Sequence, residues 1–193
     1  MRHHVVFAHP RPDSFTALLA QAYAEGTLDI GHDASVRDLY RIGFDPRLRP
    51  EELPGEALPA VLPDVAEERR RIAEAEVIVL VYPLWFNAPP AILKGYVDRV
   101  FGMGFGFGPA MQPMLVGKRL IAITTSGAPK AWLSDSGAWR ALRRLFDEHL
   151  AEVCGLTVLD HLHFGDITPG IRPDAVEACE TEARGLPARL FAD

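Results

Sequence analysis

The pattern of hydrophobic positions along the chain predicts five β-strands. Glu76–Tyr82 is a continuous apolar run, which is typical of a strand buried on both faces of a sheet. Ala34–Tyr40 instead alternates apolar and polar residues, as expected of a strand near a sheet edge. Three further β-rich runs complete the set: His3–Ala8, Lys118–Thr125 and Leu156–Phe164.

A helical pattern follows or precedes each of these strands. The predicted helices are Ser14–Ala24, Asp64–Ala75, Pro90–Phe101, Gly137–Val153 and Pro173–Leu190. Strands that alternate with helices favour a parallel sheet covered by helices on both faces, an α/β three-layer sandwich with a five-stranded parallel sheet. We expect one domain over residues 1–193, with Arg41–Pro63 as a long, partly ordered surface excursion.

Composition and charge narrow the classes of partner. The 193 residues are 48% hydrophobic and carry a formal net charge of −6, which disfavours a nucleic-acid or anionic-membrane partner. The basic run Glu68–Arg71 lies in a Glu-rich helix and is interpreted as a solvated face. Two cysteines without a Cys-x-x-Cys spacing indicate a reduced, cytoplasmic protein. A signal-peptide pattern and a long apolar run are both missing, so we expect no stable membrane insertion.

The loops that follow the predicted strands are the places to expect a ligand. In open parallel sheets ligands bind outside the carboxyl ends of the strands, near the point where strand order reverses. The first such loop, His9–Asp13, leads into a helix that Ser14 or Asp13 can cap. Ser14 Oγ, the N–H groups of Phe15 and Thr16 and the helix dipole could face a phosphate there, with His9 as a further donor.

The loop after the third strand is apolar and stiff instead of polar and flexible. It begins at Pro83 and contains Trp85 and Phe86, which could pack against a planar ligand. The loop after the fourth strand, Thr124–Pro129, is small and hydroxyl-rich, so a ring system could lie against its backbone. Together the three loops predict one flat, phosphorylated ligand.

At this point a family resemblance becomes specific. Pro83-Leu84-Trp85-Phe86-Asn87, followed by Pro90–Phe101, resembles the signature of the NAD(P)H:quinone oxidoreductases with a flavodoxin-like fold. Other segments agree in order along nearly the whole chain: His9-Pro10 with Ser14-Phe15, Asp38–Pro46, Gly104–Phe107, Thr124–Gly127 and Cys154-Gly155.

The resemblance implies a tightly bound flavin, FAD or FMN, with NAD(P)H as co-substrate and a quinone or another flat acceptor as oxidant. It implies a ping-pong, two-electron hydride transfer and a homodimer in which the second subunit completes each site. The implied flavin-binding residues are His9, Ser14, Phe15 and Thr16 around the phosphates, Pro83, Leu84, Trp85, Phe86 and Asn87 along the isoalloxazine, and Thr124, Thr125, Ser126 and Gly127 at its other edge.

Departures from the family pattern concern the catalytic residue and the size of the cofactor. Trp132 stands near the position of a family Tyr that stabilises charge during hydride transfer, and it is the catalytic candidate here, although its indole has no ionisable hydroxyl. The chain also lacks the C-terminal extension of the long members, so both FAD and FMN stay open.

Other functions were weighed against this one. A flavin-binding electron carrier, or a regulatory subunit of a membrane transporter, is the main alternative. A metal hydrolase would use His161, His163 and Asp166, but no third His or Cys ligand is evident, and we expect no metal. Ser126 lacks the Gly-x-Ser-x-Gly context of a serine hydrolase. The Gly102–Gly108 run is expected to be a loop whose Phe105 and Phe107 shape the substrate pocket or pack at a dimer interface.

Overall fold

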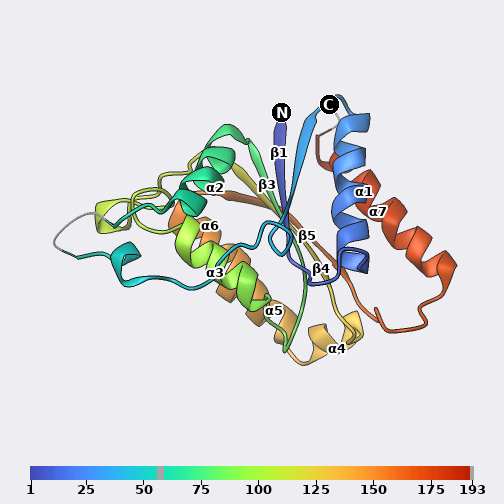
Figure 1. Ribbon diagram of the computed structural model, residues 1–193. Coiled ribbons are helices and arrows are strands. Elements are labelled where there is room, and N and C mark those ends of the chain that lie inside the picture. The colour runs from blue at the N-terminus through green and yellow to red at the C-terminus, as the bar shows by residue number, and fades with distance from the viewer. Residues whose placement is uncertain (56–58, 192–193) are drawn as a thin grey trace.

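The computed structural model describes residues 1–55 and 59–191 and contains a parallel sheet between two helical layers (Figure 1). The strand order is β2-β1-β3-β4-β5, and all four strand pairs are parallel. The predicted three-layer α/β sandwich is therefore confirmed. The strands are β1 (Arg2–Phe7), β2 (Asp33–Asp38), β3 (Val77–Pro83), β4 (Arg119–Thr125) and β5 (Thr157–Phe164).

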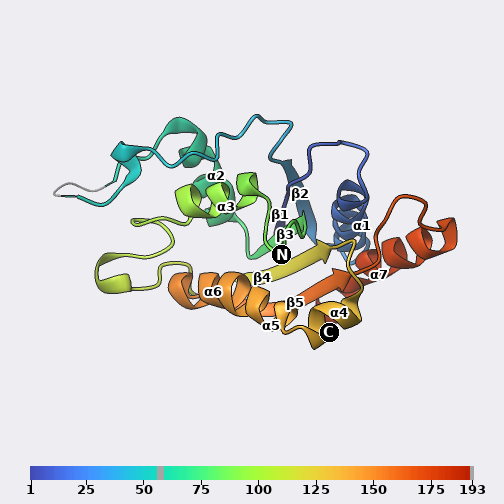
Figure 2. The same cartoon turned by 90° about the horizontal axis from the view of Figure 1, so that it is seen from below.

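The helices divide between the two faces of the sheet, as Figures 1 and 2 show. One face is covered by α1 (Phe15–Asp29) and α7 (Pro173–Phe191). The other face is covered by α2 (Pro63–Glu74), α3 (Ala91–Val100), α5 (Ala138–Arg143) and α6 (His149–Cys154). Strand β3, buried at every residue, lies in the middle of the sheet and contributes alternate side chains to both cores.

Helices α1 and α7 pack unusually closely. A Cβ added to Gly26 of α1 would lie 1.9 Å from the backbone oxygen of Arg184 in α7. Only a glycine permits such a contact, because any side chain at this position would overlap the backbone of the facing helix. The two helices are further joined by Arg184, whose guanidinium donates to Glu25 and Asp29, both at 2.9 Å.

The predicted helix over residues 137–153 is not a uniform α-helix. A π-helical turn, η3 (Arg144–Glu148), separates α5 from α6 and contains the buried Asp147. The expected loop after β4 also contains a short helix, α4 (Lys130–Asp135). π-helical turns are rare and occur frequently at functional sites.

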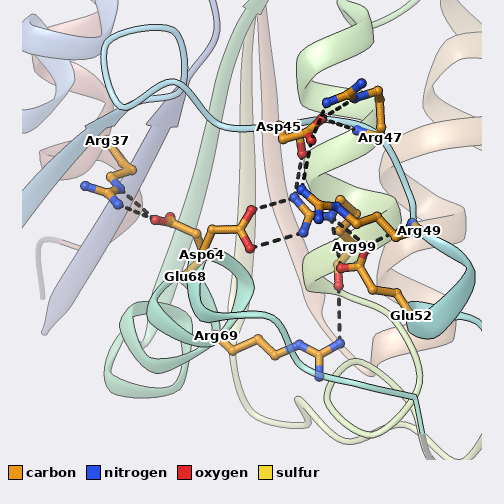
Figure 3. A network of polar contacts seen from close by, with 9 residues as sticks. All are labelled: Arg37, Asp45, Arg47, Arg49, Glu52, Asp64, Glu68, Arg69 and Arg99. Atoms are coloured by element: carbon orange, nitrogen blue, oxygen red, sulfur yellow. Dashed lines mark hydrogen bonds and ion pairs between the residues drawn. The ribbon is translucent and has the colours of Figure 1, made fainter.

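The excursion after β2 is fastened to the rest of the protein by one buried arginine (Figure 3). Arg99 of α3 donates from Nε to Glu52 (2.9 Å), and from its two terminal nitrogens to Asp64 (2.6 and 3.1 Å) and to the carbonyl of Asp45 (2.5 Å). We call Arg99, Glu52, Asp64 and Asp45 the Arg99 cluster. It joins α3 to the partly ordered surface excursion and to the start of α2.

Two further elements of the predicted surface differ in detail. The excursion contains a short 3₁₀ turn, η1 (Pro50–Glu52), and a second one, η2 (Pro109–Met111), follows the glycine run. Residues 56–58 of the predicted excursion lie outside the described residues.

The interpretation of Glu68–Arg71 as a solvated face is wrong for its first two residues. Glu68 is buried and accepts two hydrogen bonds from Arg37 of β2. Arg69 donates to the carbonyl oxygens of Val100 (2.9 Å) and Arg99 (3.2 Å). Arg70, in exposed pairs with Glu67 and Glu74, and Arg71, in a partly exposed pair with Glu67, behave as the charge pattern indicated. A charge run does not reveal which of its members faces a neighbouring strand or helix.

Candidate active site

Four loops meet at the carboxyl edge of the sheet and enclose a pocket of about 410 Å³. Three of them, after β1, β3 and β4, are the loops that strand order and composition singled out. The fourth, which follows β5, was not considered. The predicted residues that line the pocket are His9, Ser14, Phe15, Thr16, Pro83, Leu84, Trp85, Thr125, Ser126 and Gly127; the additional ones are Arg11, Ile167, Thr168, Pro169, Gly170 and Ile171.

One end of the pocket is formed by the first turn of α1. Ser14 is the N-cap, and its Oγ accepts from the Ala17 N–H (3.2 Å), as expected from the sequence. The first N–H groups of a helix have no carbonyl partner within it and carry partial positive charge. Arg11 adds a full positive charge beside them. This end of the pocket therefore suits a phosphate.

His9 lies beside this phosphate-suited end. Its Nδ1 lies 3.1 Å from the Arg11 N–H and 3.3 Å from the Arg11 carbonyl oxygen, so the backbone of Arg11 fixes the orientation of the ring. Burial lowers the pKa of His9 from its ordinary value, so the ring is uncharged near neutral pH. Its ring also contacts that of Trp85, with centroids 5.9 Å apart. His9 thus links the polar end of the pocket to its aromatic wall.

The loop after β3 ends in a tight turn with an unfavourable backbone. Trp85 and Ala88 exchange both backbone hydrogen bonds, each 3.1 Å, around Phe86 and Asn87. These two residues have φ values of 51° and 56°, which is the left-handed region. Asn tolerates this conformation, but for a bulky residue such as Phe it is strained. The turn presents Phe86, a fully exposed side chain, next to the pocket.

Two backbone N–H groups of this loop are hydrogen-bonded within the protein. The Leu84 N–H donates to the Thr125 carbonyl (2.7 Å), and the Trp85 N–H donates to the Ala88 carbonyl. Both groups are therefore occupied by the protein itself. The loop contributes a rigid apolar surface made of Pro83, Leu84 and the half-exposed Trp85.

Four predicted site residues do not line the pocket. Phe86 and Asn87 form the tip of the turn beside it, and Trp132 projects from α4 with a half-exposed side chain. Thr124 is fully buried and faces the opposite side of the sheet from Thr125, because successive strand residues point to opposite faces. Phe105 and Phe107 are also absent from the lining; Phe105 packs under Arg69 and Phe107 lines a separate apolar groove.

Thr124 belongs instead to a buried group of polar side chains. Its Oγ1 lies 2.8 Å from both His161 Nε2 and His163 Nδ1, and these histidines continue to Asp147 and Ser126. We call Asp147, His161, Thr124, His163 and Ser126 the histidine network. Among the described residues no group of three or more His, Cys, Asp or Glu side chains is placed to hold a metal ion.

Comparison with known proteins identifies the family. The profile of a family described by its flavodoxin-like fold matches residues 1–186. The chain belongs to this flavodoxin-like family. The shared fold and the pocket at its carboxyl edge agree with the resemblance read from the sequence.

Individual flavodoxin-like relatives cover most of the chain. An uncharacterised NAD(P)H oxidoreductase of Haemophilus influenzae is 33% identical over 172 residues, 86% of this chain and 85% of the relative. Mouse ribosyldihydronicotinamide dehydrogenase (quinone) is 32% identical over 178 residues, 80% of this chain and 77% of the relative. The solved NAD(P)H:quinone oxidoreductase of Methanothermobacter marburgensis superposes with a TM-score of 0.89 at 28% identity, covering 100% of this chain and 99% of its own.

Proposed function

We propose that this protein is a flavin-dependent NAD(P)H:quinone oxidoreductase. The observation that carries the proposal is the pocket itself, which joins a phosphate-suited end at α1 to a flat wall of Pro83, Leu84 and Trp85. Its relatives and structural neighbours bear quinone reductase names. A bound flavin, FAD or FMN, would take a hydride from NAD(P)H and pass it to a quinone.

The residues of the pocket fit such a cofactor. Ser14, Phe15, Thr16 and Arg11 would hold its phosphate by backbone, hydroxyl and guanidinium donors. Gly127 leaves the opposite edge open, because a Cβ added there would have no neighbour closer than 3.8 Å. A ring system can therefore lie between the β3 and β4 loops, with Thr125 and Ser126 as hydroxyl partners along its edge.

The reaction we propose is ping-pong. The pocket is open to solvent on one side, and the exposed Phe86 and half-exposed Trp85 border it. A nicotinamide and then a quinone would occupy this same open side in turn. The protein's part is to orient both molecules, exclude water from the contact and provide fixed donors for the negative charge that hydride transfer brings.

We further propose a homodimer. An apolar groove of about 380 Å³ lies between the excursion, α3 and α6. Leu48, Leu53 and Leu145 on its border are exposed, and Leu145 is 76% exposed. Apolar side chains gathered in this way are typical of an association surface. Light scattering of the purified protein measures its mass directly, and a monomer at micromolar concentration would contradict the dimer.

A reduced, cytoplasmic location is supported by the cysteines. Cys154 and Cys179 are both free thiols, and Cys154 is buried. Burial raises the pKa of Cys154 to about 12, so this thiol is unreactive. None of the helices in residues 1–55 and 59–191 has the length and apolar character needed to cross a bilayer.

The test is an absorption spectrum of the purified protein, mass identification of any released cofactor and an anaerobic NADPH titration. We expect a yellow protein that NADPH bleaches and that a quinone re-oxidises.

The variant Trp85→Gly should weaken flavin binding by at least about tenfold, because it removes the aromatic wall of the pocket. Trp132→Leu is the matched control, since this exposed tryptophan lies outside the pocket and should keep wild-type flavin affinity. Equal affinities in the two variants would contradict the pocket assignment, and a flavin that NADPH leaves oxidised would favour a carrier or regulatory protein.

A further inference from the structure

The histidine network connects the helical layer to the pocket across two strands. Thr124 of β4 and His163 of β5 are register partners, and His161 lies on the same face of β5. Asp147 approaches this face from the π-helical turn η3, and its Oδ2 contacts His161 Nδ1. At the other end Ser126, which lines the pocket, lies 3.1 Å from His163 Nε2. All five side chains are buried.

The direction of each hydrogen bond follows from the acceptor at the pocket end. A carbonyl can only accept, so Ser126 Oγ donates to the Ala128 oxygen (2.8 Å). Ser126 must then accept from His163 Nε2, which carries a proton. Burial lowers the pKa of His163 to about 4, so the ring is neutral at pH 7 and its Nδ1 is an acceptor. The Thr124 hydroxyl therefore donates to His163 Nδ1 (2.8 Å).

The remaining contacts place one extra proton at the far end. Thr124 has used its single proton, so its oxygen accepts from His161 Nε2 (2.8 Å). The other ring nitrogen, Nδ1, faces the Asp147 carboxyl group. Two bare acceptors in contact would repel one another, so a proton lies between them. The His161–Asp147 pair thus holds one proton more than a neutral histidine beside a carboxylate.

An aromatic ring covers this pair. The ring centroid of Trp139 lies 4.4 Å from that of His161, with the two planes tilted by 60°. The other titratable or charged groups around the network are Tyr82 of β3, Lys130 of α4, which acts on His163, and Asp160, which accepts from the His161 backbone N–H and pairs with Arg189.

At its Asp147 end the network meets Tyr82 of β3. Within the described part of the chain, Asp147 Oδ1 and the Tyr82 hydroxyl are both buried and make no other hydrogen bond. Burial, then the nearby Asp147 carboxylate, raises the pKa of Tyr82 well above its ordinary value, so Tyr82 stays a neutral hydroxyl beside Asp147.

We propose that the histidine network is a proton relay that supplies the pocket from the His161–Asp147 pair. Ser126 turns its hydroxyl from the Ala128 oxygen toward a group in the pocket, gives that group its proton and takes one from His163 Nε2. His163 Nδ1 takes the proton of Thr124, and Thr124 takes the proton of His161 Nε2. The three hydrogen bonds between Ser126, His163, Thr124 and His161 then point the other way, His161 is left neutral with its remaining proton on Nδ1, and one proton has entered the pocket.

This inference rests on the proposed function, whose stoichiometry needs such a proton. NAD(P)H supplies two electrons and one hydrogen as hydride, and the second hydrogen of the hydroquinone must arrive as a proton. The relay provides it, and a proton from solvent restores the His161–Asp147 pair after product release. Ser126 is the catalytic residue of this relay because it lines the pocket; the other four act through it as positioning residues.

The kinetic test uses two variants at the centre of the relay. Thr124→Val keeps the shape of the side chain and removes the hydroxyl, whereas Thr124→Ser keeps the hydroxyl. Flavin-loaded enzyme is mixed in stopped flow with NADPH, and separately with a benzoquinone after reduction, in H₂O and in D₂O. We expect Thr124→Val to slow the quinone step by at least about tenfold and to change its solvent isotope effect, with the NADPH step within about twofold of wild type. Thr124→Ser should retain the wild-type quinone step; equal quinone steps and isotope effects in the two variants would overturn the relay.

A second readout needs no flavin. ¹⁵N spectra of the histidine rings in flavin-free protein should show both nitrogens of His161 protonated and only Nε2 of His163 protonated at pH 7. Asp147→Asn should leave His161 with one proton. A neutral His161 in the wild type would refute the relay even if the enzyme reduces quinones. A wild-type protein that binds flavin but reduces no quinone would instead contradict the proposed function. The relay would then have no quinone reduction to supply with a proton.

Discussion

The Arg99 cluster and the histidine network each contain buried polar side chains, yet they are built differently. Every nitrogen of the buried Arg99 guanidinium donates to an oxygen, and the charge of arginine does not titrate. The histidine network contains two buried imidazoles and ends at Ser126, a residue of the pocket. The Arg99 cluster shares no residue with that pocket.

The contrast separates two roles that buried polar side chains can have. A network whose partners are all satisfied fixes one arrangement of the chain, here the position of the excursion over α3. A network of titratable side chains can hold its protons in two different arrangements while its heavy atoms keep the same positions. Burial and charge alone therefore do not mark a functional network; alternative proton positions next to a pocket do.

The largest expected effect is on the Arg99 cluster. Arg99→Met would leave the buried Glu52 carboxylate and Asp64 without their cation, and loss of one partner in such a cluster costs about 3–5 kcal/mol of unfolding free energy. Urea denaturation from pH 6 to pH 9 should show this loss unchanged with pH. Arg47→Met, in an exposed pair with Asp45, is the control and should stay within about 0.5 kcal/mol of wild type. If Arg99→Met lost no more unfolding free energy than this control, the contrast between the Arg99 cluster and the histidine network would not hold.

The histidine network should differ by responding to acid. Burial, then the neighbouring His161 and Lys130, lowers the pKa of His163 from 6.5 to about 4. The folded protein then binds fewer protons than the unfolded chain between these values, so this stability is complete above pH 6.5 and is lost as pH falls through 4. One pKa unit corresponds to about 1.4 kcal/mol, so His163 contributes at most about 3.5 kcal/mol.

The measurement is the slope of unfolding free energy against pH, in wild type and in His163→Gln. His3 and His4 also have pKa values lowered to about 4 by burial, so the wild-type slope contains their contribution too. The difference between the two proteins isolates His163 and should approach one proton. Identical slopes would show that His163 is not held neutral by the fold.

The smallest expected effect concerns the strained turn at the edge of the pocket. Phe86→Asn should stabilise the protein by about 0.5–1 kcal/mol, because Asn tolerates the left-handed conformation better than Phe. Val116→Asn controls for the loss of an exposed apolar side chain and should change stability by less than about 0.5 kcal/mol. We expect Phe86→Asn also to bind flavin more weakly; a variant that is more stable and binds flavin equally well would mean that the strain does not serve the pocket.

Much of the fold could be predicted because its strongest signals are local. The unbroken apolar run of β3 indicated a central strand, and the alternation of strands with helices indicated a parallel sheet. The π-helical turn could not be found in this way, since its residues continue the helical pattern on both sides. Helix α4 was missed because it is six residues long and follows Pro129 in what reads as a loop.

The candidate site was predicted where loops carried an unusual composition. The loop after β5, Ile167–Ile171, has no glycine motif or aromatic pair, and only the shared edge of a parallel sheet would have indicated it. The misplacement of Thr124 was avoidable, because Thr124 lies within β4, one residue before its end, and its side chain faces the opposite side of the sheet from Thr125. His161 and His163 were seen to share a face, but only a metal site was considered for them.

The close contact at Gly26 makes α1 and α7 a single mechanical unit. The phosphate-suited end of the pocket is the start of α1, and the β5 loop of the pocket leads directly into α7. The positions of these two parts of the rim therefore depend on the same helix–helix contact. None of the described residues of α7 lines the pocket, yet a substitution at Gly26 or Arg184 would shift α1 against α7 and so alter the spacing of the two rim segments.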